Sequence, residues 1–184
     1  NYHASEMERA FALCREFNLT PPTIFQGLYN PLNRLVEDEL LPILRKNNCR
    51  FVAFNPLAAG LLAGKHTTSD PSAVLKGRFK NNPNYLPRFY TDANFQGLDV
   101  IRKACDEAGI GMVEATYRWL LCHSALTAED GILLGASSIA QLDENLAACR
   151  AAREEKEGTR SPLPVSVLHA LDEAWKVTEA AGVF

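Results

Sequence analysis

Short apolar runs alternate with amphipathic segments along this chain, and the alternation predicts its secondary structure. Three runs have the length of buried strands, and they are Thr23–Gln26, Arg50–Asn55 and Gly131–Gly135. The second run is almost entirely apolar from Phe51 to Phe54, which is typical of a strand covered on both faces of a parallel sheet.

Apolar residues at helical spacing predict the helices around these strands. A capping box of Ser5 and Glu8 is expected to begin the first helix, and Ser138 is the expected N-cap of a later one. The predicted helices are Glu6–Phe17, Val36–Lys46, Ala93–Glu107, Val113–His123, Ile139–Glu154 and Val165–Ala180. Because helices and strands alternate through short connections, the pattern favours parallel βα units in one α/β domain over residues 1–184.

The stretch from His66 to Asp92 lacks regular periodicity. A connection of this length inside a compact domain is usually functional or disordered. Its aromatic residues favour an ordered flap over a site, and they are Phe79, Tyr85, Phe89 and Tyr90.

Composition and charge argue against several classes of protein. The net charge of −3 leaves no basic surface for nucleic acid. No apolar run approaches the roughly 20 residues of a membrane span, and no signal-peptide pattern begins the chain. The five cysteines are odd in number and lack metal-site spacing, which predicts reduced thiols, no metal site and a cytoplasmic location.

The segment after the second strand is the strongest candidate for binding chemistry. Pro56 ends the strand because proline cannot donate to a ladder. Small residues follow, and they leave the backbone accessible to a ligand: Ala58, Ala59, Gly60, Ala63 and Gly64. Lys65 then adds a positive charge. A strand end, an amide-rich loop and a lysine suit a phosphorylated cofactor, although an ordinary strand-to-loop turn has the same composition.

A Walker-type phosphate loop does not fit this segment. Such a loop needs glycine, four residues, then glycine, lysine and a hydroxyl residue. Here Ala59 occupies the first position, and His66 follows Lys65. A P-loop NTPase is therefore not expected.

Four segments together resemble the aldo-keto reductase superfamily: FQGLYN, FVAFNPLAAGLLAGK, GRF followed by YLPRFY, and LLGASSIAQLDENL. Within it, the resemblance is to the aflatoxin-aldehyde and succinic-semialdehyde reductases, and it covers nearly the whole chain in the right order. It implies the C-terminal half of a (β/α)8 TIM barrel, with strands six to eight. It also implies NADPH-dependent reduction of a small aldehyde or ketone to an alcohol by hydride transfer. The family binds NADPH without a Rossmann fingerprint, and no G-x-G-x-x-G occurs here.

The resemblance also assigns roles to individual residues. Asn1 and Gln26 would bind the nicotinamide carboxamide, and Phe54 would stack on the nicotinamide ring. The loop around the pyrophosphate would comprise Asn55, Pro56, Leu57, Ala59, Gly60, Leu62, Gly64 and Lys65. The adenosine phosphate and adenine would lie among Arg78, Ser137, Ser138, Gln141, Glu144 and Asn145. Tyr85 and Arg88 would contact the substrate, with Arg88 meeting a carboxylate.

General physical reasoning agrees with these assignments. Ligands of a βα barrel bind at the carboxyl ends of the strands, and a helix start such as Ser138 favours phosphate. An arginine can pair with a carboxylate through two parallel hydrogen bonds. The alternative for each residue remains structural: Gln26 and Asn145 as loop and helix-surface amides, and Arg88 as a solvated charge.

The family's reaction needs a tyrosine acid, a lysine, an aspartate and a histidine, all in the first half-barrel. The resemblance places this chain after that half, so no catalytic residue is expected in it and the isolated chain is expected to be inactive. The chain also stops short of the arginine that closes the substrate site in this branch, which leaves carboxylate recognition open.

A half-barrel leaves two sheet edges and one face uncovered, which favours pairing. We therefore expect a truncated product, a proteolytic piece or the ordered part of a longer polypeptide. Its expected partner is the N-terminal half-barrel or a second chain, including a homodimer.

Two other interpretations stay open. A non-catalytic NADPH-binding sensor or subunit of the same fold would retain the cofactor residues and lack turnover. A different βα-barrel enzyme, such as a phosphosugar lyase, would need acid–base residues at the strand ends, where mostly amide and apolar side chains are found. Sequence preceding Asn1 would distinguish the enzyme from the sensor.

Overall fold

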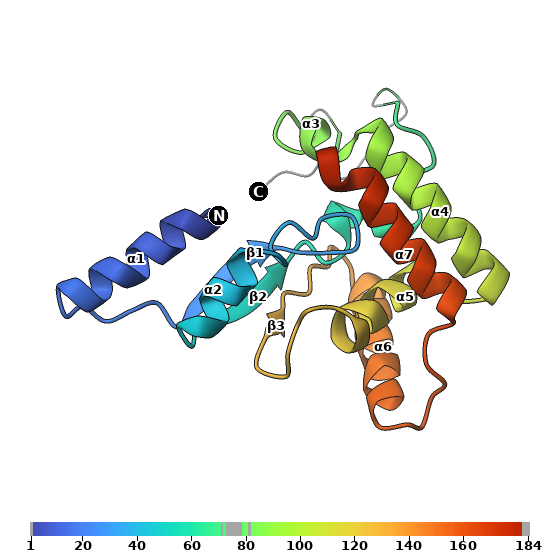
Figure 1. The fold of residues 1–184 in the computed structure, drawn as a ribbon. Coiled ribbons are helices and arrows are strands. Elements are labelled where there is room, and N and C mark those ends of the chain that lie inside the picture. The colour runs from blue at the N-terminus through green and yellow to red at the C-terminus, as the bar shows by residue number, and fades with distance from the viewer. Residues whose placement is uncertain (1, 71, 73–78, 81, 182–184) are drawn as a thin grey trace.

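The computed structural model of the protein describes residues 2–70, 72, 79–80 and 82–181, and Figure 1 shows its fold. Helices and strands alternate through the first part of the chain, and helices predominate in the second. The α-helices are α1 (Ala4–Glu16), α2 (Leu40–Lys46), α3 (Leu86–Phe89), α4 (Asp92–Ala108), α5 (Met112–Arg118), α6 (Ile139–Lys156) and α7 (Val165–Thr178). The strands are β1 (Ile24–Leu28), β2 (Arg50–Phe54) and β3 (Gly131–Ile132). The described residues also include the 3-10 segments η1 (Ala58–Ala63) and η4 (Glu179–Ala181) and the π-helix η3 (Trp119–His123).

The three strands form one parallel sheet in the order β1-β2-β3. β1 and β2 pair along their whole length, from Ile24 opposite Arg50 to Leu28 opposite Phe54. β3 pairs with β2 through its two residues alone. The prediction of parallel βα units is confirmed for these strands.

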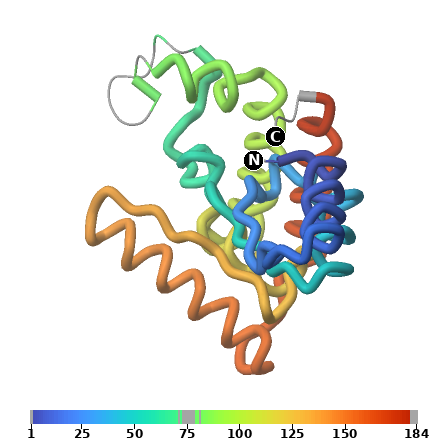
Figure 2. The backbone as a smooth tube through the Cα atoms, turned by 90° about the vertical axis from the view of Figure 1, so that its left-hand side faces the viewer, coloured from blue at the N-terminus to red at the C-terminus, as the bar shows by residue number. Residues whose placement is uncertain are grey.

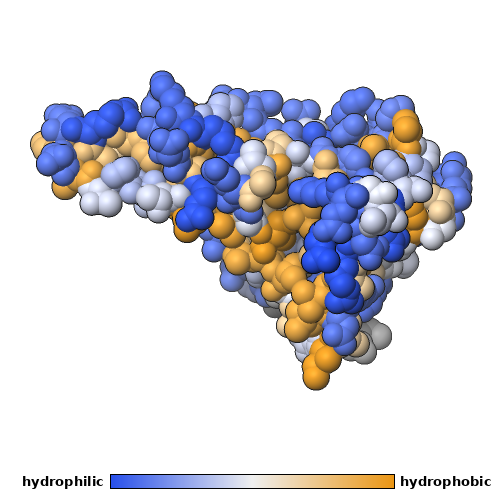
Figure 3. Space-filling model, turned by 90° about the horizontal axis from the view of Figure 1, so that it is seen from below, coloured by the Kyte–Doolittle hydropathy of each residue, from blue (hydrophilic) through white to orange (hydrophobic). Residues whose placement is uncertain are grey.

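The two faces of the sheet differ in burial. Phe25, Phe51 and Ala53 point to the covered face, where each is buried. Gln26 and Leu133 point the other way and are exposed. Apolar atoms also gather in a band across the underside of the molecule (Figure 3). The sheet is therefore covered on one face and largely open on the other.

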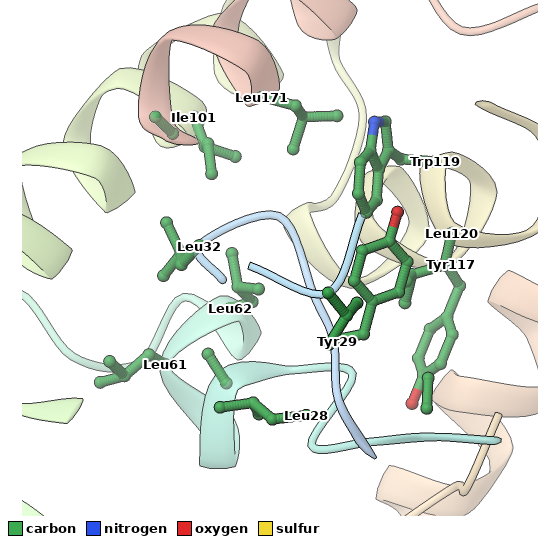
Figure 4. Close-up of a cluster of buried hydrophobic side chains, with 14 of the residues drawn as sticks. Leu28, Tyr29, Leu32, Leu61, Leu62, Ile101, Tyr117, Trp119, Leu120 and Leu171 are labelled. Carbon is green, nitrogen blue, oxygen red and sulfur yellow. The ribbon is translucent and has the colours of Figure 1, made fainter. Parts of the chain in front are cut away.

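The helices pack in pairs around the sheet. α4 and α7 run side by side, α5 packs on α6, and α1 lies against α2 (Figure 1). The main core lies where the loop after β1, η1, α4, α5, η3 and α7 meet (Figure 4). Leu61 and Leu62 of η1 insert into it with no exposed surface.

A buried carboxylate fastens the amino end of the sheet. Asp130, just before β3, has no exposed side-chain surface and accepts two hydrogen bonds from Arg45 of α2, at 2.8 and 2.5 Å. It also accepts from the Phe51 amide at 2.8 Å and the Thr127 amide at 2.7 Å. This one side chain thus links α2, β2 and the start of β3.

Several predicted boundaries are wrong. α1 begins at Ala4 after His3, whose amide donates to the Glu6 carboxylate at 2.7 Å, so Ser5 is not the cap. α2 begins at Leu40 and not at Val36. The preceding residues instead turn around a side-chain pair, in which the Arg34 guanidinium donates to the Glu37 carboxylate at 2.9 Å.

The strands also differ from their predicted lengths. β1 continues two residues past Gln26, because Leu28 still pairs with Phe54. β3 ends at Ile132 and not at Gly135, although β2 continues one residue further, to Phe54. The predicted N-cap at Ser138 is confirmed by a bond from the Gln141 amide at 3.3 Å.

The structure also bears on the predictions about cysteines, membrane spans and metal ligands. All five cysteines are free thiols. Within the described ranges, no helix is long and apolar enough to cross a membrane. In the same part of the chain, no three His, Cys, Asp or Glu side chains are grouped to bind a metal ion.

Candidate cofactor site

The carboxyl ends of the three strands meet at one edge of the sheet, as parallel pairing requires. Two of the predicted binding segments leave from this edge. One runs from Asn55 through η1 to Lys65, and the other runs from Leu133 to the start of α6. The Leu133 amide donates to the Ala53 carbonyl at 2.9 Å, which fixes the start of the second segment beside β2.

The segment after β2 contains an unusual concentration of left-handed backbone. Asn55, Ala58 and Ala59 have φ of 52°, 48° and 58°, and Gly60 and Gly64 have φ of 110° and 75°. Alanine in this region costs about 1–2 kcal/mol per residue because its Cβ crowds the carbonyl oxygen. Local strain of this kind clusters at ligand-binding sites in proteins.

The same segment has an anchored side and an open side. Leu61 and Leu62 fix it to the core, as Figure 4 shows. A Cβ added to Gly60 would meet nothing within 4 Å, so the space above that backbone is free. Lys65, at the end of the segment, is exposed. The backbone from Asn55 to Lys65 can therefore be approached closely by a phosphorylated ligand.

The start of this segment is tied to the neighbouring loop. The Tyr29 amide donates to the Phe54 carbonyl at 3.4 Å, and the Asn30 side-chain amide donates to the Asn55 carbonyl at 3.0 Å. Asn30 also accepts from the Leu32 amide at 2.9 Å.

Gln26 and Phe54 lie on the same, open face of the sheet. Side chains alternate along a strand, and Gln26 is opposite Val52 while Leu28 is opposite Phe54. Gln26 is exposed and Phe54 is half-buried. An amide and an aromatic ring are thus available on this face for a flat, polar ring such as a nicotinamide.

The segment before α6 ends at a helix N-terminus that is capped by side chains. The Ser137 amide and hydroxyl both donate to the Gln141 side-chain oxygen at 2.8 Å. Ser138 caps the Gln141 amide, as described above. Ser137 and Ser138 remain exposed, and the first two amides of the helix have no intrahelical acceptor. The helix dipole favours an anion at this point.

Asn145 and Glu144 occupy different environments in the next turn of α6. Asn145 is buried, and its side-chain amide donates to the Gly135 carbonyl at 3.1 Å, which ties the segment to the helix. Glu144 is exposed. A Cβ on Gly135 would meet nothing within 4 Å, so space remains beside this backbone as well.

The last part of the predicted flap lies against the segment after β2, since α3 contacts η1 (Figure 2). His66 Nδ1 lies 2.8 Å from the Tyr90 hydroxyl, which joins the two ends of the flap. Burial lowers the pKa of His66, so the imidazole is neutral at pH 7. Phe79 and Phe89 are buried within the same aromatic cluster. The four aromatic residues of the predicted flap therefore pack into one cluster.

Arg88 and Tyr85 lie in and beside α3. Tyr85 stacks on Phe89 with a centroid distance of 5.7 Å, and the Arg88 guanidinium lies 5.7 Å from the same ring. Arg88 Nε and Nη2 are buried and have no hydrogen-bond partner among the described residues. Two buried donors of this kind can pair with an anionic group.

The structure thus brings most of the residues that were predicted to contact the cofactor or the substrate to one region. The segments with Phe54 to Lys65 and Ser137 to Asn145 follow the carboxyl ends of β2 and β3, Gln26 lies two residues before the carboxyl end of β1, and α3 lies against η1. Asn1 and Arg78 lie outside the described residues. Sequence reasoning missed the Asn30 bond to Asn55 and the His66–Tyr90 pair, because neither motif spacing nor periodicity reveals a contact between distant loops.

A family model described as "Aldo/keto reductase family" matches residues 1–159 of the chain. Human "Aldo-keto reductase family 7 member A3" is 39% identical over 185 residues, covering 95% of this chain and 53% of that protein. "Aflatoxin B1 aldehyde reductase member 2" from Rattus norvegicus is 38% identical over 187 residues, covering 96% of this chain and 48% of that protein. The chain spans about half the length of the curated relatives it matches.

Proposed function

Because the chain belongs to the aldo/keto reductase family, we propose that it provides the NADPH-binding half of a reductase that converts aldehydes or ketones to alcohols. The observation that best supports this proposal is the left-handed segment after β2, anchored by two buried leucines and open above Gly60. The proposal includes the assignment of the chain to the C-terminal half of a (β/α)8 barrel.

The residues present fit this cofactor. Phe54 would stack on the nicotinamide ring, and Gln26 would bind its carboxamide. The backbone from Asn55 to Lys65 would surround the pyrophosphate, and the start of α6 at Ser138 would bind the 2′-phosphate. When bound, NADPH supplies the hydride of the reduction.

Arg88 supports a finer proposal about the substrate. Its unpaired Nε and Nη2 can donate two parallel hydrogen bonds to a carboxylate. Tyr85 would line the same side of the substrate pocket. We therefore propose an aldehyde or ketone that also contains a carboxylate.

The open face of the sheet indicates what else the activity requires. Ile24 on β1 and Leu133 after β3 are exposed by 52% and 45%. Exposed apolar side chains at the two edges of a sheet favour contact with further strands. We propose that the catalytic acid and the rest of the barrel come from additional polypeptide, either in the same protein or in a second chain.

A fluorescence titration with NADPH tests the cofactor assignment. Phe54→Ala is expected to weaken binding about fivefold to tenfold, since loss of an aromatic stack removes about 1 kcal/mol. Phe17→Ala is the matched control, because Phe17 is 61% exposed at the end of α1. Unchanged affinity in Phe54→Ala would contradict the placement of the nicotinamide.

The same material separates the enzyme from the non-catalytic sensor. NADPH oxidation with an aldehyde supports the reductase. Binding without turnover supports the sensor only when the assayed protein contains the rest of the barrel, because the 184-residue chain alone is expected to be inactive. An intact mass of the assayed protein shows whether polypeptide beyond these 184 residues contributes to the result.

A further inference from the structure

We propose that Asn30 is a positioning residue for the segment after β2, because its side-chain amide fixes the Asn55 carbonyl at the point where the left-handed backbone begins. This inference rests on the proposed cofactor site and extends it to a residue outside the predicted set of cofactor contacts.

Asn30 is itself rigidly placed. The residue has no exposed surface, and both ends of its side chain are used. Nδ2 donates to the Asn55 carbonyl at 3.0 Å, and Oδ1 accepts from the Leu32 amide at 2.9 Å. Its backbone exchanges two hydrogen bonds with Asn33, at 3.1 and 2.9 Å. A side chain that is held by hydrogen bonds at both ends can hold its partner in a defined position.

The hydrogen bond from Asn30 to Asn55 lies just beyond the end of the pairing between β1 and β2. Pairing between β1 and β2 ends with the Tyr29 amide, which donates to the Phe54 carbonyl at 3.4 Å. The Asn30 side chain adds one further bond beyond this point, from loop to loop. It therefore acts on the residue directly after Phe54, the proposed nicotinamide-stacking ring.

The Asn55 carbonyl joins this bond to the strained segment. The same oxygen accepts from the Ala58 amide at 2.9 Å, so both of its lone pairs are used. Ala58 and Ala59 then adopt positive φ, a conformation that alanine disfavours. Without the Asn30 bond, the Asn55 carbonyl can rotate, and the segment loses one of the contacts that oppose its relaxation.

Asn145 provides a matched comparison in the other segment. It is also a buried asparagine, and its Nδ2 donates to the Gly135 carbonyl at 3.1 Å. The two side chains thus make equivalent bonds to different segments. If each acts locally, removing one should affect its own segment and leave the other unchanged.

The experiment compares Asn30→Ser and Asn145→Ser by amide hydrogen exchange in the absence of cofactor. Serine at position 30 keeps an oxygen that can accept from the Leu32 amide and removes the donor to Asn55. We expect at least tenfold faster exchange at the Ala58 and Gly60 amides in Asn30→Ser. Asn145→Ser should instead accelerate exchange at Gln141 and its neighbours. Faster exchange in both segments of either variant, or in neither, would overturn the proposal.

Cofactor binding supplies a separate readout. In Asn30→Ser the NADPH dissociation constant should rise at least fivefold, while the circular dichroism spectrum of the folded chain is retained. Localised exchange in a protein whose wild type does not bind NADPH would support the positioning role and refute the cofactor assignment. Localised exchange with unchanged NADPH affinity would overturn the proposed role in binding.

A second variant covers the case in which Asn30→Ser does not fold. Asn30→Asp keeps the size and the acceptor of the side chain and, when ionised, lacks the donor. The same localised increase in exchange is expected. Unfolding of both variants would overturn the proposal, because Asn30 would then support the whole fold and not one segment.

Discussion

Replacement of Asp130 by asparagine tests how strongly one buried carboxylate stabilises the sheet. Its Oδ1 accepts from Arg45 and the Phe51 amide, and its Oδ2 accepts from Arg45 and from the Thr127 amide and hydroxyl. An asparagine keeps one acceptor oxygen and turns an NH2 group toward the donors of the other. At least two bonds to a charged acceptor are then lost.

The expected loss of stability is about 3 kcal/mol. Hydrogen bonds to a charged group contribute about 1.5–3 kcal/mol each, which gives about 3–6 kcal/mol for two. The lower end applies because the Arg45 side chain is 33% exposed and water can replace part of its interaction. With a urea m-value of about 1–3 kcal/mol/M, the midpoint should fall by roughly 1–3 M.

The pH dependence gives the prediction a second measurement. Burial alone would raise the pKa of Asp130, but hydrogen bonds from Arg45, Thr127 and Phe51 lower it below its ordinary value. A carboxyl with a lowered folded-state pKa stabilises the fold above its unfolded pKa of about 3.9, and this contribution is lost as the pH falls through the folded value. The stability difference between wild type and Asp130→Asn should therefore narrow below about pH 4.

Urea titrations from pH 7 to pH 2.5 measure both effects. Asp99→Asn is the control, because Asp99 pairs with Arg102 at 2.6 Å but is 67% exposed. It should change stability by less than about 0.5 kcal/mol. A loss below 1 kcal/mol in Asp130→Asn, or a difference that stays constant on acidification, would refute the reasoning.

Three further substitutions test other parts of the fold. Gly27→Ala should destabilise the protein by about 1–3 kcal/mol in urea titrations, since the new Cβ would lie 2.6 Å from Phe51 Cε2. Glu155→Gln should lower stability by about 1.5–3 kcal/mol, measured in the same way, because it removes the charge from the buried 2.7 Å pair with Arg118, which keeps Glu114 as a partner at 3.0 Å. Ser138→Ala should lower the thermal midpoint through a loss of about 0.5–2 kcal/mol in helix capping. If one of these variants were as stable as the wild type, the packing, pairing or capping that it tests would be contradicted.

The sequence was informative at several places where a local rule decides the structure, although the capping box expected at Ser5 was wrong. The apolar run at Phe51 to Phe54 predicted a strand, and the hydroxyl of Ser138 predicted a helix start, because each depends on residues close in sequence. Parallel pairing followed from the alternation of elements. The family resemblance added the site residues, which composition alone could not rank.

The features that the sequence did not predict depend mostly on contacts between segments that are distant in sequence. Before α2 starts at Leu40, Arg34 and Glu37 pair with each other, with Tyr29 at the start of the same loop and with Asp172 of α7. β3 pairs with β2 through two residues only, which the apolar run Gly131–Gly135 does not reveal. The Asn30 bond likewise joins two loops that are separate in sequence. Tertiary context of this kind overrides local pattern.

The common direction of the strands restricts how this sheet can grow. β1 and β3 form its two edges among the described residues, and all the strands point the same way. Two copies related by an axis parallel to the strands would each place β1 beside the partner's β3, and the assembly would close on itself. Head-to-tail addition through a rotation that does not close would leave a free edge for the next copy and so propagate as a filament. The orientation of the first partner therefore decides between a closed particle and an open polymer.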